Sequence, residues 1–269
     1  MQGVIQFEQQ AGVARVTLSH SARFNAMSRV MWRELRAVFE SIQRSTNVRC
    51  VVIGGENGNF CAGGDISEYA DFRFQESSLR DFHENEVWGG LQAMLDCDVP
   101  IVAQIDGNCM GAGIELASCC DIRLAGVSAR FGAPIARLGF PMAPREAALV
   151  AREVGLVTAR QMLLEAAIFS AADMKAAGFL SRVLTDDELA AEAQATALRI
   201  AALAPQAARL NKQTFRVLIS PLAPVNSAQS AANLIASDID NAYAYADSAE
   251  HREGILAFLQ KRQPAFSSH

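Results

Sequence analysis

Two glycine-rich turns and one carboxylate are the parts of this chain best placed to do chemistry. The turns lie in residues 60–69, FCAGGDISEY, and in residues 106–115, DGNCMGAGIE. Each follows a predicted strand and begins a predicted helix, so each presents backbone N–H groups that no helical carbonyl accepts. Two such groups aimed at one oxygen form an oxyanion hole. Glu115, one turn into the second helix, is placed to move a proton beside it.

Each of these features also has a purely structural interpretation. Gly63 and Gly64 fit an ordinary turn before a helix, and Gly111 and Gly113 fit close packing of a helix on a strand. Glu115 fits an acidic residue that interacts with the helix dipole. The residues alone leave both interpretations open.

Composition and charge set the class of protein. The chain has 269 residues, 51% hydrophobic and 20% charged, which predicts one large domain or one domain with a small addition. The net charge of −5 argues against nucleic acid as a partner. We recognise no signal peptide, and no apolar run reaches the roughly 18 residues of a membrane span. We therefore expect a cytoplasmic protein that does not bind membranes.

The cysteines predict neither disulfides nor a metal site. None of the six belongs to a C-x-x-C pair, and the four histidines show no ligand spacing to them. Reduced, buried thiols are the expectation. The six are Cys50, Cys61, Cys97, Cys109, Cys119 and Cys120.

The pattern of apolar residues predicts an α/β core followed by helices. Strands are expected at 4–8, 13–19, 50–53, 99–105 and 121–124, and helices at 28–44 and 77–95. The alternation of strand and helix predicts parallel pairing with right-handed crossovers. Beyond Pro144 we expect helices at 145–154, 158–164, 171–177, 188–203, 205–218, 227–245 and 248–261, with 181–184 as the only strand. This predicts a core over 1–203 and a helical C-terminal lobe over 204–269.

Five segments in this order resemble motifs of the crotonase superfamily, the enoyl-CoA hydratase/isomerase family. They are RFNAM (23–27), FCAGGDISEY (60–69), IDGNCMGAGIELASCCDIRLA (105–125), FGAPIARLGFPM (131–142) and EGILAFLQKRQPAF (253–266). The resemblance implies a spiral of ββα units with a helical C-terminal lobe, assembled as a homotrimer or homohexamer. It also implies an acyl-CoA thioester as substrate, with no metal and no cofactor other than coenzyme A itself.

The resemblance assigns roles to single residues. The N–H groups of Gly64 and Ala112 would bind the thioester carbonyl, and Glu115 would move the proton; many relatives have glycine where this chain has Ala112. The implied substrate-binding residues are Arg23, Ala26, Ala62, Gly63, Asp65, Ile66, Gly111, Ile135 and Lys261. Among them, Arg23 and Lys261, with Arg262, are candidates for the CoA phosphates. His83 and Tyr69 lie in the segment that helps to line the acyl pocket, where a packing role is equally open. Asp65 is expected to cap a helix.

One position departs from the family pattern. Hydratases carry a second glutamate after the proline of F-G-x-P-E, and here that position is Ile135. No other acid follows in sequence until Glu146. Addition of water to a 2-enoyl thioester needs one group to take a proton from water and another to deliver a proton to carbon. Arg137, two residues further, is a candidate for a substrate carboxylate or an ordinary surface arginine.

Hydration of a 2-enoyl-CoA by a hydratase-like lyase is the function that these motifs favour. Three alternatives stay open because of Ile135: double-bond isomerisation, another enolate reaction such as decarboxylation or C–C cleavage, and acyl-CoA binding without catalysis. A Rossmann-like nucleotide site is weaker, because residue 116 is Leu116 where G-x-G-x-x-G needs its third glycine.

Overall fold

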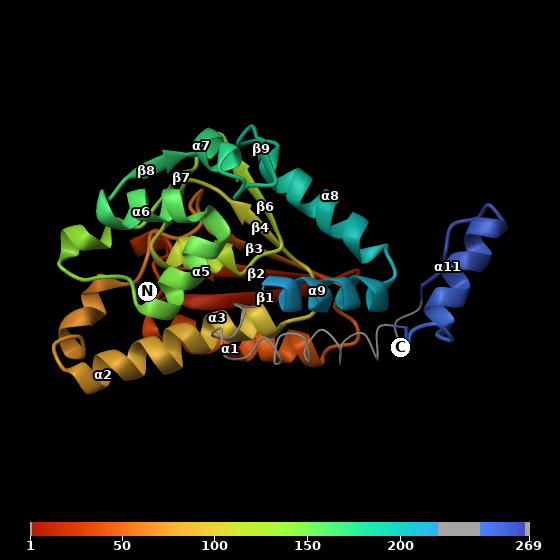
Figure 1. Cartoon of the computed structure of the whole chain (residues 1–269), viewed down its shortest axis with the longest axis horizontal. Helices are drawn as coiled ribbons and strands as arrows, with labels where there is room; N and C mark the ends of the chain where they lie inside the picture. Colours follow the sequence, from red (N-terminus) through yellow and green to blue (C-terminus); the bar gives the residue numbers. More distant parts are fainter. Residues whose placement is uncertain (1, 220–242, 267–269) are drawn as a thin grey trace, which may run out of the picture.

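A six-stranded sheet forms the centre of the computed structural model, which describes residues 2–219 and 243–266 (Figure 1). The strand order is β1-β2-β3-β4-β6-β9, in which the first pair is antiparallel and the following pairs are parallel. The predicted α/β class with parallel pairing is therefore confirmed. The strands are β1 (Val4–Gln10), β2 (Val13–Ser19), β3 (Cys50–Gly55), β4 (Ile101–Ile105), β6 (Ile122–Gly126) and β9 (Arg182–Leu184).

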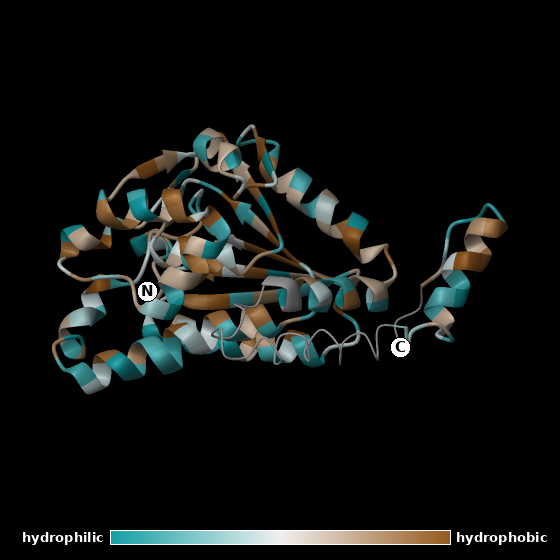
Figure 2. Ribbon diagram, viewed as in Figure 1, coloured by the Kyte–Doolittle hydropathy of each residue, from teal (hydrophilic) through white to brown (hydrophobic). Residues whose placement is uncertain are grey.

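Both faces of the central strand β3 are buried, because helices cover the sheet on each side. Val51 and Ile53 belong to the larger core cluster, which includes helix α1 (Arg29–Arg44). Val52 faces the opposite way and packs in a second cluster with α8 (Leu189–Ala201). Alternate residues of a strand point to opposite faces, so a strand covered on both sides is apolar throughout. Figure 2 shows this as hydrophobic strands inside helices of mixed hydropathy.

A second sheet of three short strands lies beside the first. Its order is β5-β7-β8, formed by β5 (Asn108–Met110), β7 (Arg130–Gly132) and β8 (Ile168–Ser170). The prediction of a single strand beyond Pro144 is wrong, because β8 precedes β9. Strand β8 has three residues and lies between α6 and α7, and a run this short is not distinguished by its pattern from the helices around it.

The helix predicted over 77–95 is present but changes its winding. It consists of α2 (Glu76–Asp81), the π-helical segment η3 (Phe82–Val87) and α3 (Trp88–Asp96). A π-helical turn inserts an extra residue per turn and often marks a functional site. His83 lies in this turn.

Five further helices of the described residues agree with the predicted ones within a few residues: α5 (Pro144–Val154), α6 (Leu156–Leu164), α7 (Ala171–Ala176), α9 (Pro205–Ile219) and α11 (Ala249–Leu259). Four short helices had no predicted bounds: η1 (Ser21–Arg23), η2 (Ile66–Asp71), α4 (Ala112–Ser118) and η4 (Pro134–Leu138). The helix predicted over 227–245 lies almost entirely outside the described residues. Within the described ranges, no helix is both long enough and apolar enough to cross a membrane.

The C-terminal helices differ in how they meet the core. Helix α9 is tied to it by two ion pairs, Lys212 to Asp121 at 2.8 Å and Arg216 to Asp98 at 2.6 Å. Helix α11 extends away from the sheet in Figure 1. The boundary predicted at 203/204 stays a prediction.

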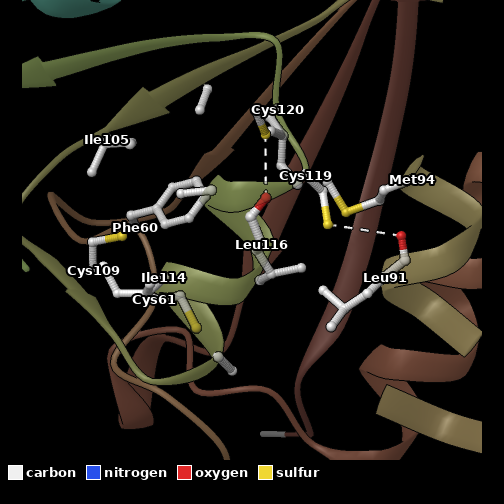
Figure 3. Close-up of a cluster of buried hydrophobic side chains, with 14 of the residues drawn as sticks. Phe60, Cys61, Leu91, Met94, Ile105, Cys109, Ile114, Leu116, Cys119 and Cys120 are labelled. Carbon is white, nitrogen blue, oxygen red and sulfur yellow. Dashed lines mark hydrogen bonds between the residues drawn. The ribbon is translucent and has the colours of Figure 1, made fainter. Parts of the chain in front are cut away.

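The predicted state of the cysteines is confirmed: all six are buried and free. Figure 3 shows several of them packed with aliphatic side chains around α4. The thiol of Cys119 donates to the Leu91 carbonyl at 3.7 Å, and that of Cys120 to the Leu116 carbonyl at 3.3 Å. Burial raises the pKa of the Cys61 thiol to about 12. These thiols therefore pack as small apolar groups.

Candidate active site

The first glycine-rich turn, residues 61–65 (loop 61–65), is held by the segment that follows β2. The Met27 N–H donates to the Gly63 carbonyl at 2.8 Å, and the Asp65 N–H donates to the Met27 carbonyl at 2.9 Å. Asp65 then caps η2 as predicted, its carboxylate accepting from the Ser67 N–H at 3.0 Å. Backbone hydrogen bonds on both sides of Gly64 thus fix the position of this loop.

Asn25 explains why the segment 23–27 has its shape. It adopts a left-handed conformation, with φ of 60°, which asparagine tolerates better than most residues. Its amide nitrogen donates to the carbonyls of Glu56 and Asn59, both at 2.8 Å. Its amide oxygen accepts from the His20 N–H at 3.0 Å. Asn25 therefore connects this turn to the loop that follows β3.

The second glycine-rich turn begins α4 directly against loop 61–65. Gly111 has φ of 49°, a left-handed conformation that favours glycine. A Cβ atom on Gly111 would lie 3.5 Å from the Gly63 Cα, and one on Gly113 would lie 2.6 Å from the Cys61 carbonyl oxygen. The two turns are therefore in close contact, and a side chain at Gly113 would push them apart.

The N–H groups of Gly64 and Ala112 remain available on these two turns. Within residues 2–219 and 243–266, neither group donates a hydrogen bond. Ala112 is the first residue of α4, where a backbone N–H has no helical partner. Unpaired N–H donors on adjoining turns can stabilise negative charge on an oxygen bound between them.

Glu115 lies in the buried helix α4 that the second turn begins. Its relative exposure is 9%, and every residue of α4 is buried. Burial and then the nearby charge of Glu146 raise the pKa of its carboxyl to about 8. A carboxyl group with such a pKa can donate or accept a proton near neutral pH.

The structure adds a second carboxyl group that our reasoning from sequence missed as a site residue. Glu146 is in the first turn of α5, with 2% exposure, and its charge acts on Glu115. One of its oxygens, Oε2, is buried and has no hydrogen-bond partner among the described residues. A signal was present in the sequence, because Glu146 shares the buried face of α5 with Leu149 and Val150, three and four residues on.

His83 holds the other oxygen of Glu146. Its Nδ1 atom lies 3.1 Å from Glu146 Oε1, and its Nε2 atom lies 3.4 Å from Arg73 Nη1. The guanidinium of Arg73 stacks on two rings, 3.7 Å from the centre of Phe140 and 4.4 Å from that of Tyr69. Desolvation by these neighbours lowers the pKa of Arg73. His83 thus links a buried carboxyl group to a partly buried cation.

Tyr69 lies over loop 61–65. A Cβ atom on Gly64 would clash with its hydroxyl oxygen, so this hydroxyl group is adjacent to the backbone of Gly64. Burial raises the pKa of Tyr69 to about 12, so the phenol is neutral at physiological pH. Tyr69 is thus beside Gly64 and His83 beside Glu146, and the lining of an acyl pocket by these two residues stays a prediction.

Ile135, which departs from the family pattern, and Arg137, two residues further on, have different surroundings. Ile135 is half-buried in η4 and packs against the main core. Arg137 is exposed, and its guanidinium donates to the Ala166 carbonyl at 3.2 Å. Arg137 thus has a hydrogen bond to the nearby backbone. The arginine that contacts Tyr69 is instead Arg73.

The residues expected to bind CoA phosphates are not joined to one another. Arg23 and Lys261 are exposed, and among the described residues no hydrogen bond or ion pair connects them. Arg262 pairs instead with Glu253 on α11, at 2.6 Å. No group of three His, Cys, Asp or Glu side chains suited to a metal ion occurs in the described part of the chain.

Comparisons with known proteins identify the family of this chain. A family model described as enoyl-CoA hydratase/isomerase matches residues 8–269. The 2,3-dehydroadipyl-CoA hydratase of Escherichia coli is 31% identical over 259 residues, covering 96% of each chain. The crystal structure of an enoyl-CoA hydratase/carnitine racemase from Magnetospirillum magneticum superposes with a TM-score of 0.90 at 35% identity, covering 100% of this chain and 97% of the other. The expected fold is thereby confirmed, and the chain belongs to the enoyl-CoA hydratase/isomerase family.

Proposed function

We propose that this protein adds water across the double bond of a 2-enoyl-CoA thioester. The observation that carries the proposal is a pair of N–H groups, of Gly64 and Ala112, without a partner among the described residues; they lie on adjoining turns, the second of which begins the helix that holds the buried Glu115. The N–H groups would bind the thioester oxygen as charge develops on it, which is the largest single contribution in such reactions. Glu115 would exchange a proton with the carbon next to the carbonyl.

Relatives support hydration over the alternatives. The E. coli relative is named a 2,3-dehydroadipyl-CoA hydratase, and another, from Clostridium acetobutylicum, a short-chain-enoyl-CoA hydratase that is 28% identical over 265 residues. The proposal needs no cofactor beyond the coenzyme A of the substrate. Isomerisation is the second candidate, because one proton-moving group between two carbons suffices for it.

The test incubates the purified protein with 2-enoyl- and 3-enoyl-CoA thioesters in heavy water and follows the products by mass spectrometry. Hydration adds water to the 2-enoyl esters, whereas isomerisation moves the double bond and introduces deuterium without adding water. We expect addition of water, and we expect Glu115→Gln to abolish it while acyl-CoA still binds. Full activity of Glu115→Gln would contradict the assignment of Glu115.

We also propose a homotrimer or homohexamer. Helix α11 carries exposed apolar side chains that such an assembly would cover, namely Ile255, Leu256, Phe258 and Leu259. Apolar surface of this kind is typical of a face that contacts another subunit. Light scattering on the purified protein measures the mass directly, and a monomer would contradict this proposal.

A further inference from the structure

The carboxyl group of Glu146 is in an unusual position for a buried acid. His83 satisfies its Oε1 atom at 3.1 Å, but Oε2 is buried and without a partner among the described residues. Buried polar atoms are nearly always hydrogen-bonded, so an unpaired one calls for a ligand or a function. The charge of Glu146 also acts on the carboxyl of Glu115, which places both acids in one region of the site.

The contacts of His83 orient the carboxyl group of Glu146. Arg73 is only a donor, so in this contact the Nε2 atom of His83 accepts. With Nε2 as the acceptor, the N–H of the ring is on Nδ1 and is donated to Glu146 Oε1. His83 therefore fixes the orientation of the Glu146 carboxyl group, with Oε1 held and Oε2 without a partner among the described residues. Glu115, whose pKa is raised to about 8, is the acid that carries a proton at neutral pH.

We propose that Glu146 is the second catalytic carboxylate of this site, positioned by His83 and Arg73, and that it replaces the acid absent at Ile135. This inference rests on the proposed hydration. Glu146 removes a proton from water as the water oxygen bonds to C3 of the enoyl thioester. The electron pair of the C2–C3 double bond moves towards the thioester, and C2 takes the proton of Glu115. Transfer of the proton from Glu146 to Glu115 then restores the starting state.

The first experiment separates hydration, which needs both acids, from exchange at C2, which needs only Glu115. Wild type and Glu146→Gln are compared for hydration of crotonyl-CoA and for deuterium uptake at C2 of butyryl-CoA. We expect the amide to lower hydration at least about 100-fold, the usual contribution of a general acid or base, and to keep exchange within about tenfold. Glu165→Gln is the matched control, because Glu165 is exposed at the end of α6.

The pH dependence of exchange gives a readout that a merely structural role would not change. Exchange requires ionised Glu115, so its rate rises with pH through the pKa of that group. Removing the charge of Glu146 removes one cause of the raised pKa, so the midpoint should move to lower pH in Glu146→Gln. Among the described residues, the other titratable groups whose charge interacts with Glu115 are Tyr69, Cys61 and Cys119.

The outcomes distinguish this inference from the proposed function. Hydration by Glu146→Gln within threefold of wild type would overturn the role of Glu146 and leave the proposed function intact. If wild type hydrates no 2-enoyl-CoA, the proposed function fails. In that case the pH midpoint of deuterium exchange still tests the inference, because an equal midpoint in wild type and Glu146→Gln would overturn it as well. Should Glu146→Gln fail to fold, Glu146→Asp takes its place: hydration at least tenfold lower with an unchanged midpoint supports the inference, and wild-type hydration overturns it.

His83 is tested as a positioning residue. His83→Ala removes the donor to Glu146, and we expect kcat for hydration to fall about tenfold with KM little changed. His83→Gln restores an N–H donor and should recover part of the lost kcat. Equal activity of wild type and His83→Ala would show that His83 does not position Glu146.

Discussion

We expect Gly113→Ala to slow the reaction strongly, because it separates the two turns that carry the N–H donors. The new Cβ would lie 2.6 Å from the Cys61 carbonyl oxygen and 3.2 Å from the Cys61 Cβ. Real Cβ atoms essentially never approach closer than 3.0 Å, so α4 and loop 61–65 must separate by at least about 0.4 Å. Ala112 precedes the substituted residue and Gly64 follows Cys61 by three positions. The shift therefore acts on the spacing of the two donors.

The size of the effect follows from the cost of losing a donor. Removal of one oxyanion-hole donor lowers kcat about 10²–10³-fold, so partial displacement should cost about 10–100-fold. Overpacking should also lower the free energy of unfolding by about 1–3 kcal/mol. The assay measures kcat and KM with crotonyl-CoA, together with urea denaturation.

Gly54→Ala is the matched control for this change. Its Cβ would lie 3.5 Å from the nearest atom, an ordinary van der Waals contact with the Gln104 carbonyl oxygen. We expect the control to keep kcat within about twofold, since Gly54 lies in β3 and carries neither donor. A folded Gly113→Ala variant with wild-type kcat would refute the reasoning that this contact sets the donor spacing.

Three further predictions concern stability and reactivity. The pKa of Glu115 is raised from 4.5 to about 8 on folding, so the contribution of this group to stability is full below the first value and is lost as pH rises towards the second. Glu115→Gln should remove this loss, about 1.4 kcal/mol per pH unit at most, and an equal pH dependence of Tm in both proteins would contradict it. Arg123→Met should lower the free energy of unfolding in urea by about 2–4 kcal/mol. The guanidinium of Arg123 donates to the carbonyls of Phe179 at 2.6 Å and Cys120 at 3.0 Å, and it pairs with Glu153 at 3.1 Å. A decrease below about 1 kcal/mol would argue against a stabilising role of these contacts. The six buried thiols should not react with a disulfide reagent in the folded protein and should all react in guanidinium, whereas rapid reaction of any thiol before unfolding would be contrary to their burial.

The parts of the fold that the sequence predicts are those with a periodic pattern. The hairpin of β1 and β2, helix α1 and the parallel strands each have several apolar residues at the spacing of their element. The short strands β5, β7 and β8 were missed, whereas β9, which is equally short, was predicted. Three residues contain too little of a period to decide between strand, helix and loop. The π-helical turn at Phe82–Val87 was missed for a different reason: its apolar residues continue the helical pattern, and the change lies in the backbone hydrogen bonds.

The candidate site was predictable where backbone conformation demands a residue type. Gly111, with φ of 49°, and Gly113, with its close approach to Cys61, occupy positions that favour glycine, so the sequence shows them directly. The sequence signal for Glu146 is weaker, because its role depends on a contact with His83, which is 63 residues away in the chain. Such a contact is set by the packing of α5 on the helix that contains the π turn, and no local pattern encodes it.

Burial of Glu146 has a physical cost that limits how a second carboxylate can be introduced. An ionised carboxyl group loses its hydration when it is buried, and only nearby donors or cations offset that loss. At Glu146 the offset comes from His83 and Arg73, and Arg73 is itself partly desolvated between two rings. These groups lie on different segments from η4, which carries Ile135. Glu146 therefore depends on His83 and Arg73. A second buried carboxylate can stand at a position other than 135 only where donors or cations such as these are available to stabilise it.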